Sequence, residues 1–376
     1  MKIKRSVIVG AIAFVVIFIV SRGRVTPYNN YVLLAQALLH GHLWITWPGA
    51  YIDALAYHGQ YYVIEAPMPA LLLLPFVAIF GTANQTLLSV ALGAVAVGAC
   101  FELGERYGLD VTANAWITAF LLAGTDLLWA SMLGDVWFIA HVSAVCFTML
   151  ALVELAGKKR GWLVALYACA ALLSRFDLVL ALPVYAYFLR SRRSLATYGA
   201  VLVPVAALWV AYNVGRWGTW YDIGYTAWYH QDPAGSPVGS PFQLRYFPYQ
   251  LWSYFIQTPQ RIAQYPYLQP TLSGVALTWT SPALIYAFFA RRPLALVIPL
   301  WVLVLLTAGP NFIYYVNGFA QFGMRHALDF EPFLVALMLL AAANQKRIPI
   351  WACALIVYSV LAGFWGCWFW NGFVRT

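Results

Sequence analysis

The fold of this chain is limited above all by its apolar runs, which follow one another with only short polar turns between them. A helix needs about 20 predominantly apolar residues to cross the hydrocarbon core of a bilayer. Charged residues make up only 9% of the 376 residues, against about 25% in soluble globular domains. We therefore predict an all-α, polytopic integral membrane protein with about 11 transmembrane helices. These helices are expected at residues 6–21, 84–103, 112–131, 136–157, 161–173, 177–189, 195–213, 273–290, 294–308, 332–343 and 349–367.

The segment between the first two predicted helices holds two further apolar stretches. Residues 31–39 carry apolar side chains on one side at helical spacing, which predicts an interfacial helix that ends at Gly41. The run from Met68 to Phe80 has 13 residues, too few to span the bilayer. We expect it to enter the membrane and return on the same side, packed against protein. Residues 22–83 then form one long outer loop.

The basic residues set the orientation if residues 68–80 do not cross the membrane. They then gather in turns that face the cytoplasm, as the positive-inside rule predicts. These 14 of the 22 basic residues are Lys2, Lys4, Arg5, Arg106, Lys158, Lys159, Arg160, Arg190, Arg192, Arg193, Arg291, Arg292, Lys346 and Arg347. We therefore expect a multi-pass protein of the cell membrane with a cytoplasmic N-terminus.

The same orientation places all six histidines and most carboxylates on the outer side. Nine of the 13 acidic residues lie in outer loops or near outer helix ends: Asp53, Glu65, Asp126, Asp135, Asp177, Asp222, Asp232, Asp329 and Glu331. Ionisable side chains at such depth need partners or a function. This distribution predicts an active site on the outer face.

A second outer segment, residues 214–279, is rich in Tyr, Trp, Pro and Gly. It includes an amphipathic helix predicted at 247–256, and its bulky apolar residues predict a lid or groove wall over the membrane face. We divide the chain into a module at 1–213, which contains the first outer loop, and a C-terminal membrane module at 214–376.

Several functional classes find no support in the sequence. The net charge of +9 comes from the short basic clusters, so no nucleic-acid partner is predicted. The five cysteines lie in apolar runs without CxxC spacing, which argues against a disulfide framework or a zinc site. No GxGxxG, Walker A, HExxH or Ser-His-Asp signature occurs, so Rossmann-type nucleotide-sugar use, ATP hydrolysis and metalloprotease chemistry are not indicated.

Several short blocks resemble a known superfamily. EAPMPALLLLP, at the end of the first outer loop, is similar in Glu65, Pro67 and Pro69 to the HPPL or EKPPL element of protein O-mannosyltransferases and aminoarabinose transferases. LLSRFDLVLALP places a basic residue in an outer turn, and the blocks YNVGRWGTWYDIGY and QFGMRHALDFEPFL resemble those of uncharacterised bacterial membrane proteins of this kind. With the layout of the first helix and loop, these blocks make the chain resemble the GT-C glycosyltransferases.

The resemblance implies a sugar donor carried on a polyprenyl phosphate and an inverting transfer on the outer membrane face. It also implies a carboxylate base just after the first helix, within an acidic pair. This chain has TPYNN there, and Asn29 and Asn30 cannot accept a proton. The base must therefore come from elsewhere in the chain.

Three carboxylates, Asp53, Glu65 and Asp135, are the candidate catalytic residues. Asp53 could accept the proton of the acceptor hydroxyl, or it could cap a helix that begins at Ala54. Glu65 could position the acceptor and join Asp53 in binding a divalent metal ion, or it could be a structural acid before a proline turn. Asp135 could join the same site or act only as an N-cap.

Two arginines, Arg175 and Arg325, are the candidate phosphate binders. Arg175 could instead form an ion pair with Asp177 or Asp135, while Arg325 and His326 could instead snorkel to the interface. Asp177 and His326 are grouped with the arginines as substrate-binding candidates.

His141 could orient a carboxylate or contact the sugar, or it could be a buried histidine with its hydrogen bonds satisfied. Tyr28, Asn29 and Trp137 complete the substrate-binding candidates. Further aromatics that could stack on sugar rings, or simply pack, are Trp220, Tyr225 and Tyr246.

The leading hypothesis is a membrane glycosyltransferase that moves a sugar from a polyprenyl-phosphate donor to an extracytoplasmic glycan, lipid or protein acceptor. The alternative is a non-catalytic protein that binds or translocates a lipid-linked glycan, or scaffolds an envelope complex. A third hypothesis is a secondary transporter. It is disfavoured because the sequence shows no internal repeat and no symmetric pair of broken helices.

Overall fold

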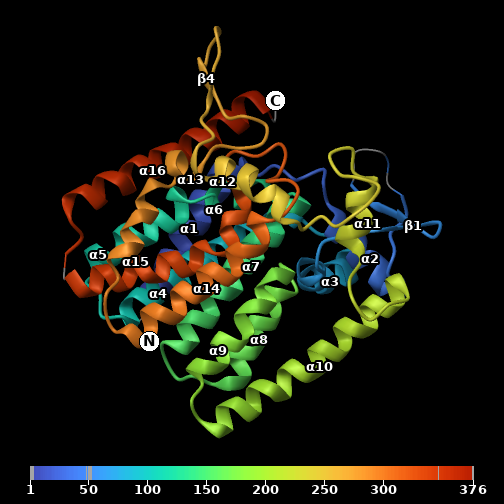
Figure 1. The fold of residues 1–376 in the computed structure, drawn as a ribbon, viewed down its shortest axis with the longest axis horizontal. Helices are drawn as coiled ribbons and strands as arrows, with labels where there is room; N and C mark the ends of the chain where they lie inside the picture. The colour runs from blue at the N-terminus through green and yellow to red at the C-terminus, as the bar shows by residue number, and fades with distance from the viewer. Residues whose placement is uncertain (1–3, 48, 50–52, 346, 375–376) are drawn as a thin grey trace.

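The computed structural model describes residues 4–47, 49, 53–345 and 347–374, and nearly all regular structure in it is helical (Figure 1). The prediction of an all-α fold is therefore confirmed. Lys2 and Lys346, which were assigned to the cytoplasmic side, lie outside the described residues.

The centre of the bundle is a row of three helices, in which α4 packs against both α1 and α7. They are α1 (Arg5–Ser21), α4 (Gln85–Arg106) and α7 (Val136–Leu155). Glycine allows the first pair to approach closely, because a Cβ on Gly98 would come within 2.8 Å of the backbone oxygen of Ser6. Small residues at such contacts are typical of helices that pack within membranes.

The helix predicted at 112–131 is broken into pieces and bent by 50°. The pieces are α5 (Val111–Ala119), the π-helical turn η1 (Phe120–Gly124) and α6 (Leu127–Leu133). Thr125 has an extended backbone at the break, and its hydroxyl donates to the oxygen of Leu121 at 2.7 Å and accepts from the N–H of Leu127 at 3.2 Å. The side chain thus replaces part of the helical ladder, which a hydrophobic pattern does not reveal.

Four helical elements follow α7 and end in an arm that reaches away from the bundle (Figure 1). They are α8 (Gly161–Leu172), the 3₁₀-helix η2 (Phe176–Ala181), α9 (Leu182–Phe188) and α10 (Arg192–Trp217). The arm α10 packs on α8, and few of its apolar residues are buried within the protein.

The C-terminal half packs on the same bundle. Its elements are α13 (Leu277–Thr280), the 3₁₀-helix η4 (Pro282–Phe289), α14 (Leu294–Phe312), the 3₁₀-helix η5 (Arg325–Asp329), α15 (Glu331–Gln345), α16 (Ile350–Phe369) and the π-helical η6 (Trp370–Val374). The continuous α-helix predicted at 273–290 is wrong, because Ser281 interrupts it with φ −136° before Pro282.

The loop regions carry short helices and two hairpins. They are α2 (Asn30–Leu39), β1 (Leu55–Tyr57), β2 (Gln60–Tyr62), α3 (Met68–Phe80), α11 (Gly224–Gln231), η3 (Leu244–Tyr246), α12 (Phe247–Phe255), β3 (Gln260–Arg261) and β4 (Leu268–Gln269). The helices predicted at 31–39 and 247–256 are confirmed as helices. Residues 68–80, which were expected to enter the membrane and return, form the single helix α3 and do not turn back within that run. The hairpin of β1 and β2 pairs Leu55 with Tyr62, and the sequence analysis did not predict it.

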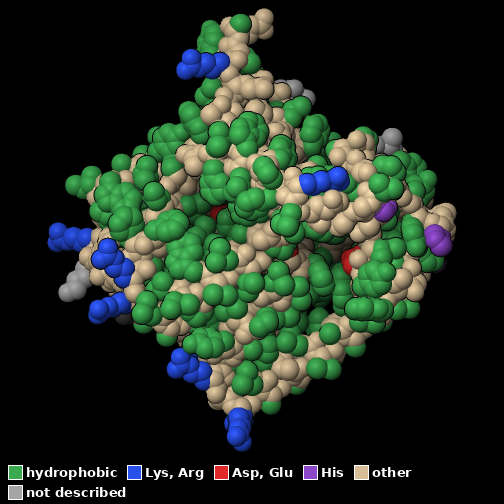
Figure 2. All heavy atoms as spheres, viewed as in Figure 1, with side chains coloured by type: hydrophobic (Ala, Val, Ile, Leu, Met, Phe, Trp, Pro, Cys, Tyr) green, Lys and Arg blue, Asp and Glu red, His purple; other side chains and the backbone are tan. Residues whose placement is uncertain are grey.

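Within the described residues, five helices are long and apolar enough to cross a membrane, or six if the bent α5–α6 pair is one span. Several shorter apolar helices accompany them, so the expected number of about 11 spans is not confirmed. The surface is largely apolar, and Lys and Arg side chains lie mainly along one edge (Figure 2). Such a surface is that of a membrane protein.

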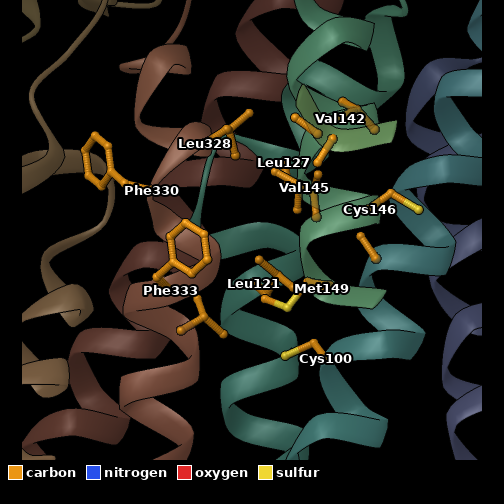
Figure 3. Close-up of a cluster of buried hydrophobic side chains, with 14 of the residues drawn as sticks. Cys100, Leu121, Leu127, Val142, Val145, Cys146, Met149, Leu328, Phe330 and Phe333 are labelled. Atoms are coloured by element: carbon orange, nitrogen blue, oxygen red, sulfur yellow. The ribbon is translucent and has the colours of Figure 1, made fainter. Parts of the chain in front are cut away.

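The core is a layer of apolar side chains shared by α4, η1, α6, α7 and the segment around α15 (Figure 3). Cys100, Leu121, Met149 and Phe333 belong to this core and are 0% exposed. All five cysteines are free thiols, and four of them are buried.

Candidate functional site

One large cavity, of about 2490 Å³, gathers residues from both halves of the chain. Its walls come from the first loop, the start of α7, the turn before η2, α10, α11 and the segment from α14 to η5. Ten of the eleven candidate site residues lie on its lining, and only Asn29, at the start of α2, does not. The ten are Tyr28, Asp53, Glu65, Asp135, Trp137, His141, Arg175, Asp177, Arg325 and His326.

A buried ion pair joins Arg175 to Asp329 at the floor of this cavity. The guanidinium donates from Nε to both carboxylate oxygens at 3.2 Å and from Nη2 to Oδ2 at 3.0 Å. Asp177 lies farther away, with its Oδ1 3.8 Å from Nε. Arg175 is therefore already neutralised by protein carboxylates, mainly by one that the sequence analysis left out of the site.

Asp329 also holds two neutral side chains. His141 is 1% exposed, and its Nδ1 lies 2.8 Å from Oδ1 of Asp329. Asn311 donates to Oδ2 at 3.3 Å. Because a carboxylate only accepts, Nδ1 of His141 carries the proton and Nε2 of the neutral ring is left as an acceptor. His141 is thus a satisfied buried histidine that also lines the cavity.

Asp53 presents its carboxylate to the cavity from the first loop. No helix begins at Ala54, because strand β1 starts at Leu55, so the capping reading is wrong. Asn30 donates from Nδ2 to the backbone oxygen of Asp53 at 2.8 Å, and Trp137 donates a hydrogen bond to its carboxylate. Burial raises the pKa of Asp53, and the negative charge of Asp232 adds to the rise.

Glu65 is more deeply buried, at 7% exposed, and its Oε2 has no hydrogen-bond partner. Burial raises its pKa from 4.5 to about 7, and the charge of Asp53 acts in the same direction. Arg325 and Arg175 oppose the shift only in part. Glu65 is therefore poised to exchange a proton near neutral pH.

Asp135 does occupy the N-cap position of α7, but its side chain does not cap the helix. Its carboxylate instead accepts a hydrogen bond from the hydroxyl of Thr26 in the first loop. Its backbone oxygen accepts from Phe138 at 2.8 Å. Asp135 is thus the N-cap residue by its backbone, while its carboxylate binds Thr26 and does not cap the helix.

Gln85, in the first turn of α4, holds the first loop against the start of α7. Its Nε2 donates to the backbone oxygens of Tyr28 at 3.1 Å and Gly134 at 2.7 Å, and its Oε1 accepts from the N–H of Tyr31 at 3.2 Å. Thr86 adds a second link, because its hydroxyl accepts from Thr26 N–H at 3.0 Å. We call Gln85 and Thr86 the polar clamp.

Arg325 is a cation in this cavity that forms no ion pair within the described part of the chain. Its guanidinium lies 5.3 Å from the ring centre of Phe138, Nη1 donates to the oxygen of Phe319 at 3.4 Å, and Nε has no partner. Among the described residues, no carboxylate oxygen lies within 4.0 Å of it. Burial and the nearby Arg175 lower its pKa to about 10, so it stays protonated at neutral pH.

Aromatic side chains line the cavity beside these charges. The rings of Tyr28 and Trp137 lie 4.8 Å apart, and Trp220 and Tyr225 also face the cavity. Tyr246 lies outside the lining and shares a hydrogen bond with Tyr229 at 2.8 Å. Four of the five aromatic candidates therefore remain available to a ligand.

One side of the cavity is an apolar groove along the arm α10. Its lining is contributed by α10, by η2, by the first residue of α9 and by α14, and comprises Val179, Leu180, Leu182, Leu202, Val205, Ala206, Trp209, Leu305 and Leu306. A groove of this composition suits a hydrocarbon chain.

A metal site can be tested against the available ligands. Among the described residues no group of three or more His, Cys, Asp or Glu could hold a metal ion. The predicted pair Asp53 and Glu65 nevertheless offers carboxylate oxygens, one of them without a partner. Mg²⁺ typically takes one or two carboxylates together with substrate phosphate, so the pair fits only that mode of binding.

Sequence analysis missed Asp329 and Asn311 as site residues. Asp329 lies in the block QFGMRHALDFEPFL, and Asn311 follows Pro310 near the end of an apolar run. The only available signal was a polar residue within or beside an apolar run. The partner of Asp329, Arg175, lies 154 positions away, and spacing alone cannot reveal such a contact.

No protein-family model matches the chain, and no curated protein does. One solved structure shares its fold, the crystal structure of ArnT from Cupriavidus metallidurans bound to undecaprenyl phosphate. The TM-score is 0.56 at 16% sequence identity over 93% of this chain. The chain covers 62% of the length of that protein.

The bundle and the outer-loop elements thus define a polytopic membrane protein with the fold of a GT-C glycosyltransferase. At this identity the likeness to ArnT, which is an aminoarabinose transferase, shows the fold alone. It agrees with the resemblance carried by the block around Glu65.

The ion pair at the cavity floor gives a first prediction. Asp329→Asn should destabilise the protein by about 3–5 kcal/mol, because it removes the closest carboxylate of the buried Arg175 and leaves Asp177, whose Oδ1 lies 3.8 Å from Nε. Unfolding in detergent, followed by circular dichroism, measures the change. Glu154→Gln is the control, since its partner Arg160 is 45% exposed, and it should cost about 1 kcal/mol or less. Equal losses would contradict the prediction.

Proposed function

We propose that this protein is a GT-C glycosyltransferase that moves a sugar from a polyprenyl-phosphate donor to an extracytoplasmic glycan, lipid or protein acceptor. The observation that carries the proposal is one cavity that combines the carboxylates of Asp53 and Glu65, the unmatched cation of Arg325 and an apolar groove. The fold shared with a protein solved with undecaprenyl phosphate supports it. The cavity draws on both proposed modules, 1–213 and 214–376.

The proposed reaction is a single displacement with inversion. The acceptor hydroxyl attacks the anomeric carbon, Asp53 takes the proton, and the bond from that carbon to the phosphate oxygen breaks. The leaving polyprenyl phosphate gains negative charge, which Arg325 stabilises by charge-assisted hydrogen bonds. The groove along α10 holds the lipid chain, and Trp137 orients the base. Tyr28 provides a face for the sugar ring.

Asn30 explains how the chain can do without the acidic pair after the first helix. It is fully buried and holds the backbone of Asp53 at 2.8 Å. We infer that Asp53, brought in by the loop before β1, takes the place of the acid that the family carries at TPYNN. The sequence position differs while the carboxylate still faces the cavity.

Asp53→Asn should lower the rate of sugar transfer by about 10²–10⁴-fold while leaving donor binding intact, because the amide cannot accept the proton. Turnover is measured as polyprenyl phosphate released from radiolabelled donors by the purified protein. Asp110→Asn is the matched control, since Asp110 caps α5 far from the cavity and Asn caps equally well. Full activity in Asp53→Asn would remove Asp53 from the role of base.

Arg325→Gln should weaken donor binding by about 10–100-fold, because it removes charge-assisted hydrogen bonds to the phosphate. Titration with polyprenyl phosphate, followed by tryptophan fluorescence, measures the affinity. Arg193→Gln removes an exposed arginine near the start of α10 and should bind normally. If Arg175→Gln weakens binding while Arg325→Gln does not, the assignment of the phosphate binder is wrong.

Glu65 gives a prediction with a defined pH range. Its pKa is raised to about 7 in the folded protein, so the stability it contributes is present below about pH 4.5 and is lost as the pH rises through 7. Relative to Glu65→Gln, the wild type should therefore melt progressively lower between pH 5 and pH 8. Thermal scans of both proteins in detergent measure this difference. A pH-independent difference would show that Glu65 is not perturbed.

A divalent metal ion remains part of the proposal through Asp53 and Glu65. Bound together with the donor phosphate, it would supply positive charge to the leaving group. Turnover after treatment with EDTA, and after addition of Mg²⁺ or Mn²⁺, tests this. Unchanged turnover in EDTA would assign the phosphate charge to the arginines alone.

The orientation is proposed with the cavity on the outer face and the N-terminus in the cytoplasm. Cysteines introduced at His58 and Arg292, in a background without Cys353, should react differently with an impermeant maleimide. In intact cells His58→Cys should be labelled and Arg292→Cys should not. Equal labelling would place both on one side and overturn the proposal that α3 does not cross the membrane.

The replacement of the family acid by Asn29 and Asn30 also favours a second function, a non-catalytic protein that binds or translocates a lipid-linked glycan. The same radiolabelled donors discriminate between the two. Donor binding without release of polyprenyl phosphate, across a panel of glycan, lipid and peptide acceptors, would favour the second function.

A further inference from the structure

Two acidic side chains outside the cavity lining have no role in the proposed reaction. Asp126 stands at the break between η1 and α6, and Glu331 is the first residue of α15. They are 3% and 1% exposed. Leu127, which follows Asp126, and Phe333, two residues after Glu331, belong to the same apolar core (Figure 3), and the charge of Asp126 acts on Glu331. The two carboxyl groups therefore lie in the same part of the interior.

Neither carboxylate has a protein partner. None of the four oxygens accepts a hydrogen bond, and in the part of the chain that the structure describes no cationic side chain forms an ion pair with either residue. The surrounding charges act from farther away: Arg325 on Asp126, and Asp329 on Glu331. By contrast, Asp329 itself receives hydrogen bonds from Arg175, His141 and Asn311.

The backbone around Asp126 is shaped to lie against its carboxylate. Gly323, in the loop before η5, has no side chain there, and a Cβ would come within 2.3 Å of Oδ1 of Asp126. Leu127, Leu328 and Phe330, which are sequence neighbours of the two acids, belong to the apolar core in Figure 3. Water therefore has little access to the pair.

Two ionised carboxylates in such surroundings cost several kcal/mol each unless a positive charge joins them. The broken helix offers one way to bind it, since discontinuous membrane helices use unwound carbonyls and helix C-termini to bind Na⁺. Here η1 ends at Gly124, two residues before Asp126. Glu331 stands at the N-terminus of a 15-residue helix, where the dipole favours the ionised carboxylate.

We propose that Asp126 and Glu331, together with backbone carbonyls at the end of η1, bind a sodium ion that joins the bent α5–α6 segment to α15. The donor set contains only hard oxygen atoms. The described residues form no cluster of three or more His, Cys, Asp or Glu, which argues against a zinc-type site. The proposed sodium site is separate from the donor site, because neither acid lines the cavity.

The test uses the full-length protein in detergent. Its melting temperature is recorded as NaCl replaces N-methylglucamine chloride at constant ionic strength, and ²²Na⁺ binding is measured in parallel. Specific binding of the ion to the folded state should raise the melting temperature by about 2 °C or more, with saturation. Binding should approach one ion per chain. A wild-type protein that shows neither effect overturns the proposal, whatever the behaviour of any variant.

Asp126→Asn and Glu331→Gln locate the site, because each amide keeps the side-chain size while removing the charge. Each should abolish ²²Na⁺ binding and the sodium-dependent shift. Glu105→Gln, near Arg5 on the basic edge, is the control and should retain both. If the wild type binds sodium and both variants bind it equally well, the ion lies elsewhere. Variants that melt higher than the wild type at every salt concentration would show a protonated acid pair instead.

Discussion

The carboxylate of Asp329 is the interaction on which the rest of the site depends. It receives Arg175 from the turn after α8, His141 from α7 and Asn311 from α14. Three separate parts of the chain are thus fixed to one charge in the interior. A buried cation without this partner would face a large desolvation penalty. The ion pair therefore allows an arginine to stand at the cavity floor of an otherwise apolar bundle.

The polar clamp, Gln85 and Thr86, fixes the first loop to the bundle by hydrogen bonds, as Asp329 fixes the cavity floor. Gln85 and Thr86 are 0% and 2% exposed. They bind backbone groups of the first loop and of the turn between α6 and α7. Gly134 fits this contact because a Cβ there would lie 2.5 Å from the Cα of Thr86. Backbone groups in a membrane interior must find protein partners. The clamp supplies them, and so holds the first loop at Tyr28 against Leu133 and Gly134, which lead into Asp135.

The sequence predicted most helices, because long apolar runs leave few alternatives. It also predicted α2 and α12 as helices and the limits of the apolar run that forms α3, since Gly41, the amphipathic pattern and Gly81 mark them. It could not predict the break at Thr125, where a hydroxyl replaces backbone hydrogen bonds. Nor could it find Asp329 as a partner of Arg175, because that contact links residues 154 positions apart. Local patterns reveal elements, while long-range polar contacts need the fold.

Arg175 and Arg325, two of the arginines that line the cavity, show how such contacts assign different tasks to the same side chain. Arg175 is held by protein carboxylates, whereas Arg325 touches an aromatic ring and one backbone oxygen. An unmatched buried cation lowers stability unless something of opposite charge joins it. Glu65, whose charge acts on Arg325, has a pKa raised to about 7, so its charge is only partly available there. A phosphate group would complete the balance, since it brings negative charge and several acceptor oxygens to the place where Nε of Arg325 has no partner.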